Sequence, residues 1–161
     1  MAKKKPVITN AMRGLTAAKI PFEAIEYEVD EVGDNFGVQI AELTGIPCEK
    51  SFKTLVAKGN EIMVACVPVD SEVDLKKLAV ASGNKKVELI AVKDLLALTG
   101  YVRGGVSPIG MKKKYATYIH ETCLRFDKMA VSGGVCGVTL LLSPDDLIKV
   151  TNAVACDIIK E

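Results

Sequence analysis

Apolar runs in this chain are short, and this feature limits the folds open to it most strongly. The longest strongly apolar stretch covers residues 62–69, and these eight residues already include Pro68. A membrane-spanning helix needs about 20 consecutive apolar residues, so the sequence predicts no membrane span. A run of this length, rich in β-branched residues, is typical of a strand. We therefore expect short strands and short helices.

Turn-forming residues separate these elements. The turn Lys58-Gly59-Asn60 joins residues 52–57 to residues 62–69 and predicts a β-hairpin. The spacing of apolar residues predicts further strands at 22–29, 86–90, 115–119, 128–131 and 138–142, and helices at 10–19, 74–82 and 93–98.

Two more helices are predicted from their end signals. One carries Phe36 and Ile40, begins with Asp34 as its cap, and ends at Gly45. The other begins at Ser143-Pro144, where a hydroxyl cap precedes proline at the first helical position, and we expect the chain to continue helically beyond Ala153.

The order of these elements favours one fold class. Strands and helices follow one another without a regular β-α-β alternation, and no repeat or linker interrupts them. We expect a single α+β domain over residues 1–161, with a mixed, mostly antiparallel and barrel-like sheet surrounded by helices. Residues 1–9 are predicted to be a basic, flexible tail. With 49% hydrophobic and 25% charged residues in 161, the chain has a globular composition.

Cysteine and histidine usage excludes several kinds of chemistry. The five cysteines contain no Cys-x-x-Cys pair, and there is one histidine, His120. We therefore predict no metal site, and no phosphate-binding glycine motif calls for a cofactor. No secretory signal is recognised, which predicts a cytoplasmic protein with free thiols. Cys66 and Cys156 are expected in the core, whereas Cys136 is expected in a loop.

Charge is distributed unevenly along the chain. Residues 21–50 carry eight acidic residues and one basic residue, whereas residues 51–115 carry eleven basic and six acidic residues. A basic face would suit an anionic partner. An ordinary solvated surface explains the same pattern, and both interpretations stay open.

Two features are candidates for binding. The aliphatic stem of Lys53 is expected to pack on apolar side chains, with the ammonium at the rim of a binding site. The alternative is an ordinary strand lysine whose ammonium simply extends into solvent. The loops at 104–110 and 132–134 are rich in glycine, which allows backbone N–H groups to approach an oxyanion or a phosphate. Turning the chain is the alternative role of such loops.

Five motifs in fixed order carry a family resemblance. They are Ser51-Phe52-Lys53-Thr54-Leu55-Val56, Asp74-Leu75-Lys76-Lys77, Lys85-Lys86-Val87-Glu88, the segment from Thr99-Gly100-Tyr101-Val102 through Gly104-Gly105-Val106-Ser107-Pro108 to Gly110, and Val131-Ser132-Gly133-Gly134 with Gly137. Together they resemble the YbaK/EbsC family of aminoacyl-tRNA deacylases, best known for Cys-tRNA(Pro) deacylation. The family is related to the editing domain inserted in bacterial prolyl-tRNA synthetases.

The resemblance implies an enzyme that clears Cys mischarged onto tRNA(Pro), with the aminoacylated 3′ end of tRNA as substrate and prolyl-tRNA synthetase as partner. It implies catalytic roles for Lys53, which would orient the substrate or stabilise an oxyanion, and for Gly104 and Ser132. It implies substrate-binding roles for Tyr27, Phe36, Thr54, Gly105, Ser107, Gly133 and Gly134.

The family resemblance also implies an unusual mechanism. No protein side chain acts as nucleophile; instead the substrate thiol attacks its own ester carbonyl and leaves a cyclic thiolactone. Two alternatives stay open: a deacylase for another small amino acid on tRNA(Pro), such as Ala, and a non-catalytic module that binds tRNA or a synthetase. Val135-Cys136 and Thr139 stand where many relatives carry two basic residues and an acidic residue.

Overall fold

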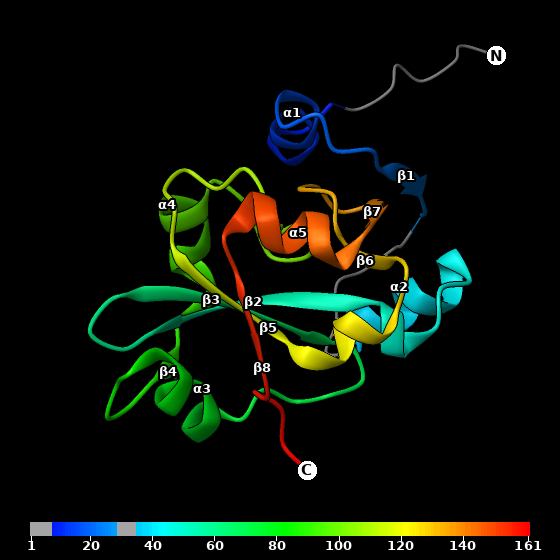
Figure 1. Cartoon of the computed structure of the whole chain (residues 1–161). Coiled ribbons are helices and arrows are strands. Elements are labelled where there is room, and N and C mark those ends of the chain that lie inside the picture. Colours follow the sequence, from blue (N-terminus) through cyan, green and yellow to red (C-terminus); the bar gives the residue numbers. More distant parts are fainter. Residues whose placement is uncertain (1–7, 29–34) are drawn as a thin grey trace, which may run out of the picture.

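The computed structural model describes residues 8–28 and 35–161. Most of the predicted tail at residues 1–9, the end of the first predicted strand at Val29, and the predicted cap Asp34 lie outside the described residues. Two sheets and five α-helices make up the described chain (Figure 1).

The larger sheet has five strands in the order β4-β2-β3-β5-β8. Its bounds are β2 (Phe52–Lys58), β3 (Ile62–Pro68), β4 (Glu88–Leu89), β5 (Ala116–His120) and β8 (Val154–Cys156). The predicted hairpin is present, because β2 pairs with β3 antiparallel over the full length of both strands. β3 pairs with β5, and β5 with β8, in parallel.

The smaller sheet has three antiparallel strands in the order β1-β7-β6. They are β1 (Glu23–Glu26), β6 (Met129–Ser132) and β7 (Val138–Leu142). A single parallel bridge between Ser51 and Ala130 joins the two sheets. This bridge brings the start of β2 next to β6, and both of these strands contribute to the site described below.

The helices are α1 (Asn10–Ala17), α2 (Phe36–Thr44), α3 (Leu75–Ser82), α4 (Leu95–Thr99) and α5 (Pro144–Thr151). Short 3-10 turns lie at η1 (Cys48–Lys50), η2 (Val92–Asp94) and η3 (Glu121–Arg125). Their ends follow sequence signals: the Thr9 hydroxyl accepts from the Met12 N–H, and the Asp74 carboxylate accepts from the N–H groups of Lys76 and Lys77.

Helices cover both faces of the larger sheet. Figure 1 shows α1 and α5 on one side of it and α3 on the other. Val64 and Cys66 of β3 pack into the core that includes α1, α5 and the smaller sheet, whereas Ala65 and Val67 pack against α3. Burial on both faces explains why the longest apolar run is continuous rather than alternating.

The C-terminal segment differs from the prediction. The expected helical continuation past Ala153 is wrong, because Asn152 adopts a left-handed conformation that ends α5 and the chain returns as β8 beside β5. The expected core position of Cys156 is also wrong, since this residue is only partly buried on the edge strand. Cys123 is the second fully buried cysteine beside Cys66.

The predicted fold class is confirmed: the chain is α+β, with mostly antiparallel sheets and surrounding helices. Within the described residues, no helix is long and apolar enough to cross a membrane.

Candidate active site

A pocket of about 360 Å³ lies where the two sheets meet. Its wall combines residues from α2, β2, the region from η2 to α4, the loop at 103–106, β6 and β7. Most of the wall is apolar and includes Phe36, Ile40, Phe52, Val56, Val106 and Val131. The pocket thus unites the first glycine loop with the strand that carries Lys53, two features far apart in the sequence.

Four hydroxyl groups interrupt the apolar wall. They belong to Ser51, Thr54, Ser132 and Thr139. Ser132 and Thr139 are direct partners on the paired strands β6 and β7, so their side chains leave the sheet side by side. The Thr54 hydroxyl lies 3.8 Å from the buried Cys66 sulfur. These groups can orient a small polar ligand in an otherwise apolar space.

The two glycine loops pack directly against each other. A Cβ atom on Gly105 would come within 2.9 Å of the Val135 Cα and 3.0 Å of the Cys136 N, so only glycine permits this approach. Gly104, beside it, has a φ of 88° and forms part of the pocket wall. This contact between the loops holds the first loop in place, with the Gly104 backbone against the pocket.

Several loop N–H groups already have partners inside the protein. Gly105 N–H donates to the Val102 carbonyl, Gly133 N–H to the Val138 carbonyl, and Gly134 N–H to the Ser132 hydroxyl. These three groups maintain the loops, so stabilisation of an oxyanion must come from other donors on the wall.

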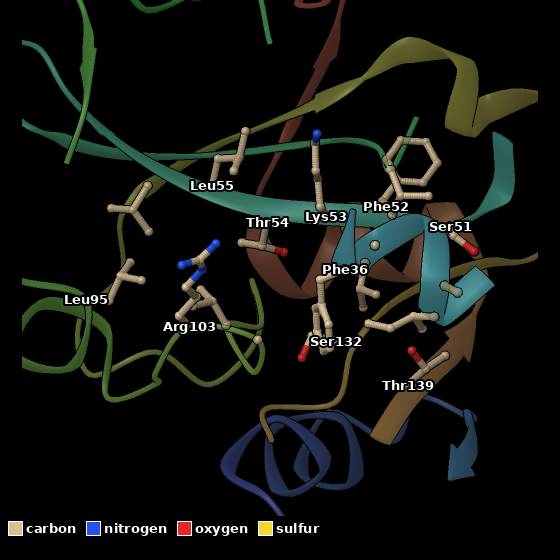
Figure 2. Close-up of a pocket in the computed structure, with 18 of the residues that line it drawn as sticks. Phe36, Ser51, Phe52, Lys53, Thr54, Leu55, Leu95, Arg103, Ser132 and Thr139 are labelled. Atoms are coloured by element: carbon tan, nitrogen blue, oxygen red, sulfur yellow. The ribbon is translucent and has the colours of Figure 1, made fainter. Parts of the chain in front are cut away.

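Lys53 lies at the edge of the pocket. Figure 2 shows its side chain on the opposite side of β2 from Ser132 and Arg103. Burial lowers the pKa of the Lys53 ammonium, and the carboxylates of Glu72 and Asp70 partly oppose this shift. The Lys53 side chain thus leaves β2 on the side away from Ser132 and Arg103, and its predicted oxyanion role stays a prediction.

Arg103 is the pocket cation that sequence reasoning missed. It occupies the variable position between Val102 and Gly104 in the loop motif, and its side chain lines the pocket. Figure 2 shows its guanidinium turned toward Thr54. The only sequence signal was a basic residue inside a glycine-rich loop, and a guanidinium there can hold a carbonyl or phosphate oxygen.

Candidate nucleophiles lie elsewhere. His120 is buried at the end of β5, where its Nδ1 accepts from the Ile158 N–H at 3.3 Å. None of the five cysteines lines the pocket, and all five are free thiols. Burial raises the pKa of Cys66 to about 12 and that of Cys123 to about 11, and it also raises the pKa of Cys136. These thiols stay protonated near neutral pH.

Five of the ten predicted site residues line the pocket: Phe36, Lys53, Thr54, Gly104 and Ser132. The other five, Tyr27, Gly105, Ser107, Gly133 and Gly134, lie outside its wall. Ser107 is fully buried, and its hydroxyl accepts from the Ile109 N–H. The Tyr27 N–H donates to the Gly137 carbonyl, which ties Tyr27 to the second glycine loop. These contacts support the loops around the pocket.

Fold and site together define a small α+β domain with one apolar, hydroxyl-bearing pocket between two sheets. The family model described as "Aminoacyl-tRNA editing domain" matches residues 37–150. The chain belongs to this family, and the predicted resemblance is confirmed.

Named relatives agree with this assignment. The chain is 46% identical over 156 residues to "Putative Cys-tRNA(Pro)/Cys-tRNA(Cys) deacylase EbsC" from Enterococcus faecalis, which covers 94% of both chains. It is 39% identical over 75 residues to "Proline--tRNA ligase 1" from Streptomyces avermitilis, a match to 46% of this chain and 13% of the ligase. A crystal structure titled as a "putative trans-editing enzyme for prolyl tRNA synthetase" has the same fold, with a TM-score of 0.81 and 20% identity over 97% of this chain and all of the other.

Proposed function

We propose that this protein removes Cys from mischarged tRNA(Pro) in trans. The enzyme class, an aminoacyl-tRNA deacylase, follows from membership of the editing-domain family and from the 46% identical relative, whose name describes a Cys-tRNA deacylase. The proposal adds the amino acid, the tRNA and the chemistry of the reaction.

The observation that carries the proposed chemistry is the composition of the pocket wall. Among the described residues that line it, none is a cysteine, histidine, aspartate or glutamate. Such a wall offers hydroxyls, an arginine, the Lys53 side chain and apolar surface, but neither a thiolate nor a carboxylate or imidazole base. A substrate that brings its own nucleophile fits this wall.

In the proposed reaction, the thiol of the esterified cysteine loses its proton and attacks the carbonyl carbon of its own ester. A sulfur–carbon bond forms, the bond from that carbon to the ribose oxygen breaks, and the ribose oxygen takes up a proton. The products are free tRNA and a cyclic thiolactone. The thiol and the carbonyl already belong to one molecule, so the protein contributes by holding them in a reactive conformation rather than by bringing two molecules together.

Arg103 and Lys53 are the two cations of the pocket wall, and Arg103 lies on the same side of β2 as Ser132. The Arg103 guanidinium faces the pocket, and the Lys53 ammonium sits at its rim. A preorganised cation or donor aimed at a developing negative charge contributes about 3–4 kcal/mol in comparable sites. Ser132 and Thr54 would orient the substrate amino group and carbonyl through their hydroxyls.

Size alone cannot make this pocket selective for Cys. One extra group in an apolar pocket changes binding by only about 1–3 kcal/mol, so Ala and Ser would also enter. Selectivity then comes from reactivity: a thiol is a few per cent ionised near pH 7, whereas a hydroxyl is almost entirely protonated.

A panel of mischarged tRNAs tests the proposal. We expect the purified protein to deacylate Cys-tRNA(Pro) well above the spontaneous rate, and Ser-tRNA(Pro) and Ala-tRNA(Pro) much more slowly. Faster loss of Ala than of Cys would establish the alternative deacylase. No acceleration with any ester, together with retained tRNA binding, would establish the non-catalytic module.

A further inference from the structure

A second surface adjoins the pocket and combines exposed apolar and basic side chains. We call it the α4 patch. It consists of the apolar residues Leu89, Val92, Leu96 and Val102 and the basic residues Lys93, Arg103, Lys112, Lys113 and Lys114. Val92, Leu96 and Val102 are each more than half exposed to solvent. Large apolar side chains this exposed and this close together indicate a contact surface.

Backbone contacts hold the parts of the α4 patch together. The Lys112 N–H donates to the Thr99 carbonyl at 3.0 Å, and the Lys112 stem packs beside Gly100. The Tyr115 hydroxyl donates to the Leu98 carbonyl at 2.6 Å. These bonds fasten the lysine run to the end of α4, although the lysines lie far beyond the helix in sequence.

The α4 patch is continuous with the pocket. Leu89, Val92 and Arg103 belong to both the patch and the pocket wall. A ligand whose end occupies the pocket can therefore continue onto this patch. Figure 2 shows Leu95 of α4 and Arg103 near each other on one side of the pocket.

We propose that the α4 patch binds the single-stranded 3′ end of tRNA, that is, the nucleotides preceding the aminoacylated adenosine. This inference rests on the proposed function and names the surface that the substrate uses outside the pocket. Lys112, Lys113 and Lys114 contact phosphates, and Val92 and Leu96 cover the faces of unstacked bases.

The positive charge of the α4 patch favours RNA over other ligands for this surface. Residues 85–115 contain seven basic and two acidic residues. Proteins meet nucleic-acid phosphates with lysine and arginine. Single-strand sites usually add aromatic side chains on which bases stack, and in the α4 patch the exposed aliphatic side chains of Val92 and Leu96 would take that place. A protein partner with an acidic, apolar surface would use the same side chains, so the experiment below separates the two occupants.

The test compares two substrates and two charge-reversal variants. The patch variant carries Lys112→Glu, Lys113→Glu and Lys114→Glu. The control variant carries Lys76→Glu, Lys128→Glu and Lys149→Glu, three exposed lysines outside the patch that give the same change in net charge. The substrates are Cys-tRNA(Pro) and a cysteinyl ester of adenosine, which fills the pocket but has no phosphates.

We expect the patch variant to lose more than about tenfold in kcat/KM with Cys-tRNA(Pro) and to match the wild type with the adenosine ester. The control variant should match the wild type with both. Binding of uncharged tRNA should weaken in the patch variant, and the slope of log affinity against log salt should become shallower by roughly two, because each phosphate contact on a single strand contributes about 0.7.

Equal tRNA affinity and equal salt dependence in the patch variant and the wild type would overturn the assignment. Equal losses with both substrates in the folded patch variant would overturn it too, since they would indicate a damaged pocket. If the wild type cleaves neither ester while the patch variant still loses tRNA affinity, the proposed function fails and the α4 patch stands. Retained tRNA affinity combined with lost binding of prolyl-tRNA synthetase would assign the patch to a protein partner instead.

Discussion

At the scale of single residues, Lys53 is the most direct test of the pocket. Lys53→Ala should abolish most of the activity because it removes a positive charge from the pocket rim, while the fold stays intact because the half-buried stem contributes little to the core. The measurement is kcat/KM together with the melting temperature. Lys58→Ala, on the same strand but exposed, is the matched control. Wild-type turnover in folded Lys53→Ala would remove Lys53 from the site.

Cys136 tests the proposed nucleophile. Cys136 is an exposed residue of the second glycine loop, beside Gly133-Gly134. Partial desolvation of its sulfur still raises the pKa of the thiol, which leaves little thiolate near neutral pH. The Cys136→Ala variant should therefore keep a deacylation rate within a few-fold of the wild type. Variants with serine at any one of the other four cysteine positions should do the same. At buried positions the serine variants should lose about 1–3 kcal/mol of stability.

Two results would contradict this expectation for Cys136. One is a folded Cys136→Ala variant that binds substrate but shows no turnover. The other is a covalent aminoacyl adduct trapped on Cys136 and found by mass spectrometry. Either would assign the attack to the protein rather than to the substrate thiol.

His120 should make stability depend on pH. Burial lowers its pKa below the ordinary value of 6.5, with Asp157 and Glu121 partly opposing the shift. His120 therefore binds a proton more readily in the unfolded chain than in the folded protein. Above about pH 6.5 it is neutral in both states and leaves the free energy of unfolding unchanged. As the pH falls from there toward the folded pKa, the free energy of unfolding decreases. His120→Asn keeps an acceptor near the Ile158 N–H but does not titrate. Urea midpoints from pH 8 to 5 should fall more steeply for the wild type; parallel curves would show that His120 does not contribute.

At the scale of structural elements, the contact between the two glycine loops determines where the first loop lies in the pocket wall. Gly105→Ala should cost about 1–3 kcal/mol by overpacking and lower kcat/KM about tenfold or more, because the added methyl group pushes Gly104 away from its place on the pocket wall. Gly83→Ala is the control: its φ of 72° also resists a side chain, but nothing lies within 4 Å. It should lose stability and keep activity. Full activity in folded Gly105→Ala would refute this role for the contact.

Elements with strong local signals were predictable from the sequence, and elements defined by distant partners were not. The hairpin follows from its turn, and α3 follows from Asp74 and Gly83 at its ends. The β8 strand has three residues and exists because β5 offers an unpaired edge, which no local pattern reveals. The prediction of continued helix failed for this reason.

The same distinction applies to the pocket. Phe36, Thr54 and Ser132 were identified through the family resemblance, and the structure places them on one wall. Arg103 was missed because its motif position is variable and no spacing rule marks it. Ser107 and Gly133 belong to the motifs yet are buried within the two glycine loops and do not line the pocket, so a motif residue can support a site without touching its ligand.

At the scale of the whole molecule, the described surface near the pocket has little with which to distinguish one tRNA from another. The α4 patch suits the single-stranded 3′ end, and the terminal CCA of this end is the same in every tRNA. The isolated protein should therefore deacylate Cys-tRNA(Pro) and Cys-tRNA(Cys) at rates within a few-fold of each other. Selectivity would then require a second protein that binds tRNA(Pro), and we propose prolyl-tRNA synthetase for this role.

Competition between the two substrates measures this specificity. Both tRNAs carry the same cysteinyl ester, so the pocket chemistry cancels and the ratio of kcat/KM reports tRNA recognition alone. Adding prolyl-tRNA synthetase should raise the ratio in favour of tRNA(Pro), because the synthetase binds that tRNA and increases its effective concentration near the pocket. A catalytically inactive synthetase is the control, since it tethers tRNA without recharging it. If the isolated protein cleaves Cys-tRNA(Pro) and ignores Cys-tRNA(Cys), the domain itself reads tRNA identity, and a surface beyond the α4 patch must contact the body of the tRNA.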